Sequence, residues 1–534
     1  MKSLLILALA IPLTADAQGT RWNESWVGSE WEVYARALAD RGMLGVEPWS
    51  VRPFAPGLMQ RNVAPPAVLD DQGRRLTAPA RVGPWQSRLA VPDTLSSFIL
   101  LRPSVATSYN SGFAWGMQDG PVWQGRGLNA WGTLGFTWRF GVLSARIEPL
   151  FDYAQNGDFA LEPPNIGTSP YADDLRPITI DLPQRFGNSS FHIVDPGQSY
   201  VRVDYKGGAI GFSTENIFWG PGVRQALLFD ANAGGFPHVF IGSSHAIPTP
   251  IGRFHAQLIY GRLEESKYAP HSTTTSRFGA GGIGVWMPTS TIEIGVARFY
   301  HRGWPSGLSA RDLFVPFGSF VNDREVQGVG EPENQLLTVF ATFRLPSSGF
   351  EVFGEFGKND RNGNLRDALV EPEHNSAWLL GTLKVIGIPL PDTPFWTLRA
   401  EAASGRVSPI QDLGRGQSTF YDHTTVTQGH TQAGQLLGTP LIDRSGGLDL
   451  AVDRWSPGGR LGVELFERQM PPDLAVGLPA DQIRSQWDLS FTGTRFFGTS
   501  DLTFSVGHVW DLDRFPKKDM GNMYLRVGFR AALP

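Results

Sequence analysis

Pairs of carboxylate residues are candidate catalytic groups, because two carboxyl groups at a fixed separation can cleave a glycosidic bond. Glu351 and Glu355 share one face of an extended strand. They lie about 13 Å apart at about 3.3 Å per residue, which is too far for either glycosidase geometry. Asp173 and Asp174 are adjacent and point apart. We interpret these carboxylates as solvated loop charges and predict that the protein is not an enzyme.

Histidines gather in two regions, three of them between His238 and His255 and two more at His423 and His430. Neither spacing forms a metal-ligand pair on a helix, and the chain has no cysteine to complete a zinc site. The glycine-rich run 279–284 matches a dinucleotide fingerprint, but a strand-like run into a proline follows it where a helix is needed. We therefore expect neither a metal nor a cofactor.

Within the stretch Gly211 to Gly222, a Trp-Gly-Pro-Gly turn at 219–222 directly follows an expected strand. Proline and glycine make this a rigid turn that presents the indole ring of Trp219. A freely moving external loop would not need such a turn. If the protein is a binder and not a pore, Phe218 to Pro237 is the first candidate for a loop that folds into the lumen.

The N-terminus has the features of a secretory signal peptide. An apolar run from Leu4 to Leu13 follows Lys2 and ends at Ala15-Asp16-Ala17. We predict a signal peptide at 1–17 and a mature chain that begins at Gln18. The net charge of −5 and the lack of a long basic run predict that nucleic acid is not a partner.

Alternating apolar and polar residues recur from Ser96 onwards, as in Val201 to Lys206. Long polar segments, such as 154–197, separate many of these stretches. A closed barrel satisfies every backbone group in lipid without an apolar helix. The pattern therefore predicts an all-β fold, a transmembrane antiparallel β-barrel over 96–534 with an even number of strands between about 16 and 20. Asn522 to Phe529 is the expected closing strand.

Residues 18–60 do not alternate. Ser29 to Glu32 fits a capping box, apolar residues follow at helical spacing, and Gly42 lies where a C′ glycine would end the helix. We predict that 18–95 is a small periplasmic helical segment packed near the barrel mouth. A disordered tether is the alternative, because the segment has little core of its own.

Four stretches in order along the chain form a recognisable set of motifs. They are Leu38 to Gly42 with Pro48 to Ser50, Phe218 to Gly222 with Leu227 to Asn232, Glu373 to Asn375, and Tyr421 to His423 with Gly429 to Thr431 and Leu437-Gly438. Together they resemble the Wzi family of capsule assembly proteins. The resemblance implies a barrel of about 18 strands with a small periplasmic helical bundle, for which the helical segment here is short.

The resemblance also implies a lectin-like outer-membrane protein that binds capsular or exported polysaccharide and holds it at the cell surface. Several motif positions are then candidates either for binding polysaccharide or for plugging the lumen. They are Asn216, Trp219, Gly220, Pro221, Gly222, Asn232, Tyr421, His423 and His430.

A passive outer-membrane porin for oligosaccharides is the alternative function. It differs from a binder only in whether the lumen is open. The sequence does not show whether the loops between strands fold into the lumen. In either case we expect a monomer in the outer membrane of a Gram-negative-type bacterium, with contacts to membrane lipid.

Overall fold

The structure, a computed structural model, describes residues 27–45, 47–56, 58, 68–69, 75–76, 83–89, 96–164, 169–269, 276–305, 310–317, 333–359, 375–406, 420–470, 483–514 and 518–531. The predicted signal peptide and Gln18 lie outside these described residues. The described helices include α1 (Glu30–Asp40), α3 (Pro84–Leu89), α4 (Ala310–Phe314) and the 3-10 helices η1 (Val315–Phe317) and η2 (Pro440–Ile442). No helix in the described ranges is long and apolar enough to cross a membrane.

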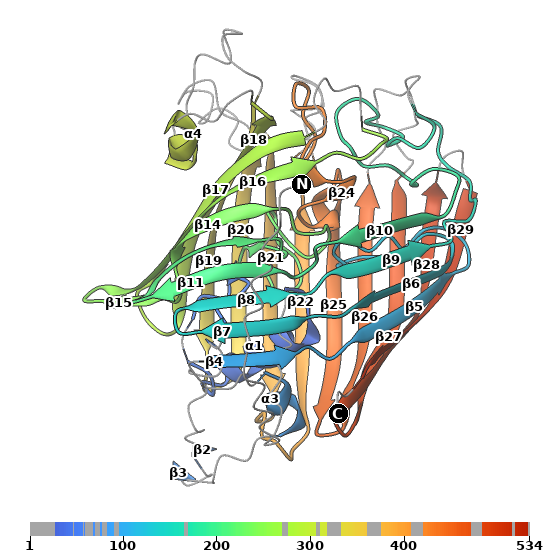
Figure 1. The fold of residues 1–534 in the computed structure, drawn as a ribbon. Helices are drawn as coiled ribbons and strands as arrows, with labels where there is room; N and C mark the ends of the chain where they lie inside the picture. The colour runs from blue at the N-terminus through green and yellow to red at the C-terminus, as the bar shows by residue number, and fades with distance from the viewer. Residues whose placement is uncertain are drawn as a thin grey trace, which may run out of the picture.

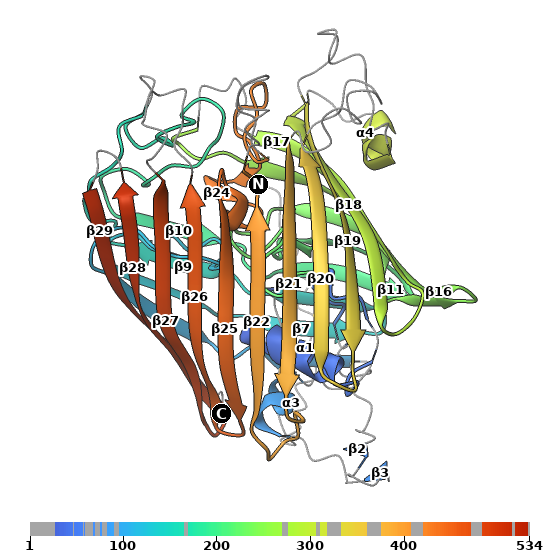
Figure 2. The same cartoon turned by 180° about the vertical axis from the view of Figure 1, so that it is seen from behind.

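Antiparallel strands form one closed barrel (Figure 1, Figure 2). Five of its strands are interrupted, and each continues as a second segment. Pro103, Pro149 and Pro196 lie at three of the breaks, because proline has no N–H to continue the ladder. The paired segments are β4 (Ser96–Leu100) and β5 (Ser104–Asn110), β6 (Gly127–Thr133) and β7 (Phe136–Phe140), β8 (Leu143–Ile147) and β9 (Leu150–Ala154), β10 (Phe191–Asp195) and β11 (Tyr200–Tyr205), and β14 (His238–Ser243) and β15 (Ile247–Thr249).

The other barrel strands are continuous. With each interrupted strand counted once, the described residues form eighteen barrel strands. The continuous strands are β12 (Gly208–Ser213), β16 (Gly252–Glu264), β17 (Ser276–Met287), β18 (Ile292–Gly303), β19 (Glu333–Leu345), β20 (Phe350–Asn359), β21 (Ser376–Ile386), β22 (Phe395–Ser404), β25 (Gly446–Ser456), β26 (Gly459–Met470), β27 (Arg484–Phe497), β28 (Ser500–Arg514) and β29 (Lys518–Arg530). Short strands outside the barrel include β1 (Val51–Arg52), β2 (Val68–Leu69), β3 (Arg75–Leu76), β13 (Phe218–Trp219), β23 (Thr431–Gln432) and β24 (Gln435–Leu436).

The last strand closes the barrel against one of the first. β29 pairs with β5 from Tyr524 opposite Asn110 to Arg530 opposite Ser104. The expected closing strand lies within β29, and the predicted antiparallel barrel is confirmed. The glycine-rich run 279–284 lies inside strand β17.

Side chains of β29 alternate between the two surfaces of the wall. Leu525, Val527 and Phe529 are exposed on the outside, whereas Asn522 and Tyr524 are buried inside. The same pattern places exposed leucine, isoleucine, valine and phenylalanine on strands around the barrel. An outward apolar surface around a polar interior is typical of a barrel in an outer membrane.

The two ends of the barrel differ. At one end the strands join through short turns, such as 206–207, 457–458 and 498–499. At the other end the connections are long and include 111–126 and 214–237. In outer-membrane barrels the short turns face the periplasm and the long loops face the cell exterior.

Helix α1 lies inside the barrel outline near the short-turn end, with α3 beside it (Figure 1). Tyr34 of α1 and Trp85 of α3 stack with their ring centroids 5.2 Å apart, and both rings contact Trp455 on β25. Gly42 follows α1 with a φ of 67°, so it is the expected C′ glycine.

The predicted capping box at the start of α1 is wrong in one respect. Ser29 is the N-cap residue, but its side chain makes no capping hydrogen bond. The carboxylate of Glu32 instead accepts from the N–H of Gly28 at 3.1 Å and from Arg52 at 3.0 Å. Because Arg52 comes from β1, the helix start is fixed by a tertiary contact.

The two surfaces of the wall should tolerate charge differently. Val527→Arg puts a charge on the outer surface and should cost up to about 4 kcal/mol of folding free energy. The matched control is Thr503→Arg, because Thr503 is exposed inside the barrel opposite Gly528, the neighbour of Val527. Refolding into vesicles, read as the heat-modifiable band on a gel, should fall only for Val527→Arg. Equal refolding yields would contradict the assignment of surfaces.

Candidate functional site

Three segments meet inside the barrel and form what we call the plug, namely residues 27–45 with 47–52, 214–237 and 420–445. Strand β1 pairs with β13 through Val51 opposite Trp219 and Arg52 opposite Phe218. The backbone N–H of Asp230 donates to the carbonyl of Leu437 at 2.8 Å, which ties the second segment to the third. The plug is therefore one folded unit built from distant parts of the chain.

A buried arginine joins the plug to the barrel wall. Arg36 of α1 donates to both carboxylate oxygens of Glu351 on β20, at 2.9 and 2.8 Å. It also donates to the carbonyls of Pro221 and Gly222, at 2.5 and 2.7 Å. The rigid Gly220-Pro221-Gly222 turn brings these two carbonyls together. Gly222 must be glycine here, because a Cβ would lie 1.7 Å from the carbonyl oxygen of Gln225.

Inward carboxylates of the wall hold backbone groups of the plug. Glu401 on β22 accepts from the N–H of Val223 at 2.8 Å, and Glu355 on β20 accepts from the N–H of Leu227 at 3.1 Å. The interpretation of Glu351 and Glu355 as solvated charges is therefore wrong, since both are buried. Each is retained inside because it has hydrogen-bond donors that offset its loss of hydration.

The indole of Trp219 points into the plug and is fully buried. It meets Phe229 edge-on at 5.4 Å, while its backbone pairs with Val51. The turn does not present this ring to a ligand, because apolar side chains of the plug and wall surround it.

The side-chain amides of Asn216 and Asn232 stabilise the second plug segment through hydrogen bonds. The Asn216 amide nitrogen donates to the carbonyl of Ala233 at 2.8 Å, and its oxygen accepts from the N–H of Gly235 at 3.0 Å. Asn232 donates to the carbonyl of Leu436 at 3.3 Å. Asn216 is buried, whereas Asn232 is half-buried and lines a cavity described below.

The structure brings Tyr421 and His430 together. Their rings stack with centroids 5.5 Å apart. The Tyr421 hydroxyl donates to the carbonyl of Leu227 at 2.8 Å, and Nε2 of His430 lies 2.6 Å from the carbonyl oxygen of Leu228. His423 does not join them, because its Nδ1 accepts from the N–H of Val426 at 2.9 Å within its own turn.

Burial sets the protonation of the two stacked groups. It lowers the pKa of His430 to about 4, and the nearby Arg277 guanidinium adds to the shift. Burial also raises the pKa of the Tyr421 hydroxyl well above its ordinary value. Both side chains are therefore neutral at pH 7 and act as hydrogen-bonding and packing groups.

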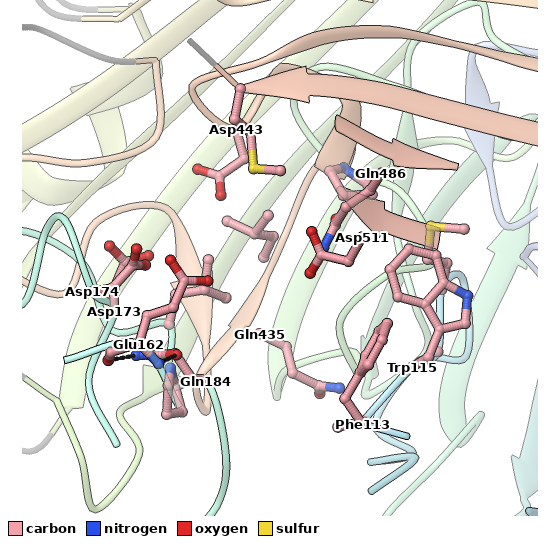
Figure 3. A pocket seen from close by; sticks show the side chains of 18 of the residues that line it. Phe113, Trp115, Glu162, Asp173, Asp174, Gln184, Gln435, Asp443, Gln486 and Asp511 are labelled. Carbon is pink, nitrogen blue, oxygen red and sulfur yellow. Dashed lines mark hydrogen bonds between the residues drawn. The ribbon is translucent and has the colours of Figure 1, made fainter. Parts of the chain in front are cut away.

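A cavity of about 530 Å³ opens beside the plug at the long-loop end, and we call it the outer cavity. Phe113 and Trp115 lie on one side of it and Glu162, Asp173 and Asp174 on the other (Figure 3). Other labelled side chains that line the same cavity are Gln435, Asp443, Gln486 and Asp511.

Most charges around the outer cavity are paired. Arg176 binds Asp173 at 3.0 Å and Asp443 at 2.6 Å, and Arg484 binds Glu162 at 2.6 Å and Asp511 at 2.7 Å. The expectation that Asp173 is a solvated loop charge is wrong, because this residue is buried against Arg176.

Asp174 differs from its neighbours. Burial, with the neighbouring Asp173 carboxylate, raises the pKa of Asp174 to about 8, and its carboxyl group is hydrogen-bonded to Glu162. It is therefore mostly protonated at pH 7 and can donate a hydrogen bond. The cavity thus combines aromatic surface with fixed donors and acceptors. Within the described ranges no group of three or more histidine, aspartate or glutamate side chains is placed to hold a metal ion.

The residues of this region that the sequence did not single out are mainly inward arginines and carboxylates of the strands. Arg277 on β17, for example, donates to the carbonyls of Gly429 and Thr431, both at 2.5 Å. The sequence feature that could have identified them is a charged residue at an inward-facing position of an alternating strand. Of the motif at 373–375, Glu373 and His374 lie outside the described residues.

A closed barrel with an apolar outer surface and an interior occupied by its own chain defines an outer-membrane β-barrel protein with a plugged lumen. The chain belongs to the family of the capsule assembly protein Wzi, whose family model matches residues 117–508. The resemblance found in the sequence is thus confirmed. None of the curated proteins matches the sequence.

Several solved structures are similar to this chain. One is Wzi of Escherichia coli, described as an outer membrane protein involved in group 1 capsule assembly and a carbohydrate-binding β-barrel. It is 14% identical, with 95% of this chain and 99% of that chain covered and a TM-score of 0.62. OpdQ of Pseudomonas aeruginosa is 8% identical over 82% and 98% of the two chains, with a TM-score of 0.41. OccAB2 of Acinetobacter baumannii is 9% identical over 80% and 97%, with a TM-score of 0.40.

Acidification should loosen the plug around His430. An unfolded histidine gains a proton near pH 6.5, whereas folded His430 gains one only near pH 4, so its contribution to stability falls as the pH falls through this window. At pH 5 the loss should be about 2 kcal/mol. Hydrogen exchange of the backbone at 421–437, corrected for the intrinsic rate, should therefore show more frequent opening at pH 5 than at pH 7.

His430→Gln is the control, because glutamine keeps a donor for the carbonyl of Leu228 and does not titrate. This variant should show a smaller pH dependence of exchange. The same dependence in both proteins would contradict the role assigned to His430.

Proposed function

We propose that the protein binds capsular or exported polysaccharide and holds it at the cell surface, with the outer cavity as the binding site. The observation that carries this proposal is the position of the cavity, at the long-loop end beside a lumen that the plug fills. Membership of the Wzi family and the description of Escherichia coli Wzi as carbohydrate-binding support it.

The chemistry of the outer cavity suits a sugar chain. A pyranose ring has an apolar face that stacks on aromatic side chains and a rim of hydroxyl groups that need donors and acceptors. Phe159 supplies a half-buried ring at this cavity, and guanidinium groups of Arg185 and Arg514 lie 6.0 Å from its centroid. Gln435, also half-buried, supplies an amide.

The predicted site residues then have different roles. We assign Trp219, Gly220, Pro221 and Gly222 to the plug. Asn216, Tyr421, His423 and His430 join them there, because each is buried away from the surface. Asn232 serves both, since it links two plug segments and lines the outer cavity.

The geometry of the outer cavity fits a binding site better than the active site of a glycosidase. The carboxyl groups of Asp174 and Glu162 are in hydrogen-bonding contact, closer than the separation of at least about 5 Å that a glycosidase needs. A passive porin fits less well, because the plug occupies the lumen. We keep the monomeric state, the contact with membrane lipid and the cleaved signal peptide at 1–17 as predictions.

The domain boundaries also belong to the proposal. The segment 18–95 supplies the first part of the plug and packs near the barrel mouth, and 96–534 forms the barrel with the remaining plug segments. The contact of Arg36 with Glu351 supports this division of roles, because it fixes the first part to the wall of the second.

Phe159→Ala should weaken binding of purified capsular polysaccharide about tenfold, or about 1.4 kcal/mol, because a stacking surface is lost. The matched control is Phe491→Ala, which removes the same ring from the lipid-facing surface of β27. Titration of the detergent-solubilised proteins with polysaccharide from the producing strain gives the affinities. The ratio of cell-bound to released polymer should fall only for Phe159→Ala.

No binding by the folded wild-type protein would overturn the proposed function. Equal affinity of Phe159→Ala and wild type would instead move the site away from the outer cavity.

A further inference from the structure

A second cavity of about 460 Å³, here called the inner cavity, lies within the barrel between the plug and the inner face of one part of the wall. That wall comprises β5, β6 and β26 to β29. The inner cavity reaches Ser104 and Arg530, where β5 begins and β29 ends near the short turns. At its other end it reaches Trp115 and Asp119.

The lining of the inner cavity is mixed, with inward polar side chains among apolar ones. Its wall carries hydroxyl groups at Thr494, Thr503 and Ser505 and charged groups at Asp488 and Arg526. Thr503 is exposed although it faces the interior of the barrel. Inward hydroxyl and charged side chains are the lining that water-filled barrels use.

The outer and inner cavities are separated by one loop. Among the described residues, both cavities are lined by Trp115, Met117, Asp119 and Val122. All four belong to 111–126, the connection between β5 and β6, which we call the gate loop. One layer of this loop thus stands between the long-loop end and a partly hydrophilic space that extends toward the short-turn end.

The gate loop is held to the wall by side-chain contacts. Nε1 of Trp115 donates to Asp488 on β27 at 2.8 Å. Arg526 on β29 pairs with Asp119 at the long distance of 3.4 Å. Asn110, at the end of β5, donates to the carbonyl of Trp115 at 3.1 Å.

The plug is attached differently. Glu355, Glu401 and Arg277 bond to its backbone from β20, β22 and β17, on the wall away from the two cavities. Releasing the gate loop would therefore join the cavities without removing these bonds.

We propose that the inner face of β5, β6 and β26 to β29 lines a closed passage for small hydrophilic solutes, and that the gate loop is its gate. Ions and free sugars of one to three units are the solutes that match this lining and the cavity volumes. The polysaccharide site shares Trp115 and Met117 with the gate, so occupation of the outer cavity bears directly on the gate loop. The proposal is independent of the identity of the polysaccharide.

The test is conductance in planar lipid bilayers. A variant with Phe113 to Gln124 replaced by a short glycine-serine linker should give steady conductance at least tenfold above that of wild type. Swelling of liposomes that contain this variant should be fast in glucose and slow in a long malto-oligosaccharide. Arg526→Gln, which removes the pair with Asp119, should open more often than wild type.

Tyr421→Phe is the control for general loosening of the plug, because it removes the hydroxyl bond to Leu227 and leaves the gate loop intact. It should stay closed. Conductance of Tyr421→Phe equal to that of the shortened variant would overturn the proposal. So would a shortened variant that folds to a heat-modifiable barrel and does not conduct.

A cysteine reporter locates the current, since the natural chain contains no cysteine. Thr503→Cys in the shortened variant places one thiol in the inner cavity. A cationic methanethiosulfonate reagent should then reduce the conductance, and it should leave the cysteine-free shortened variant unchanged. An unchanged current in the Thr503→Cys protein would place the path elsewhere and overturn the assignment.

Discussion

The guanidinium group of Arg36 is bound at the same time by a strand of the barrel and by the turn at 221–222. A closed barrel whose strands carry inward charges must supply each of them with a partner or with water, because an unpaired charge in a dry interior is costly. Here the plug supplies many of those partners through its backbone. The barrel and its contents therefore stabilise each other.

The plug fills the lumen unevenly. Its apolar residues pack on inward side chains that include Phe299 of β18, Phe340 of β19 and Leu379 of β21. Across the lumen, the wall from β26 to β28 borders both cavities, and β29 borders the inner cavity. This division places a dry, fixed interface on one side and a partly hydrophilic space on the other, so recognition and stability use different parts of one barrel.

The fold follows from the sequence where the physics is local. Alternation along Asn522 to Phe529 identifies the closing strand, and Gly42 identifies the end of α1, because both depend on neighbouring residues. Side-chain roles inside the lumen depend on contacts between distant segments. The sequence predicts a turn that presents the ring of Trp219, although Phe229 and the wall enclose it. Ser29 reads as a capping residue although Arg52 binds the glutamate that would complete the box. The sequence identifies the motif positions but does not show which of them face a cavity.

The contact between Arg36 and Glu351 spans 315 residues of the chain, and that between Glu30 and Arg460 spans 430. Contacts this distant in sequence form late, since the chain between them must first be ordered. Helix α1 is made early in synthesis, yet its partners on β20 and β26 do not exist until most of the barrel has been translated. The contacts that fix α1 thus cannot be complete before these strands are in place, which links the position of one helix to the formation of the barrel around it.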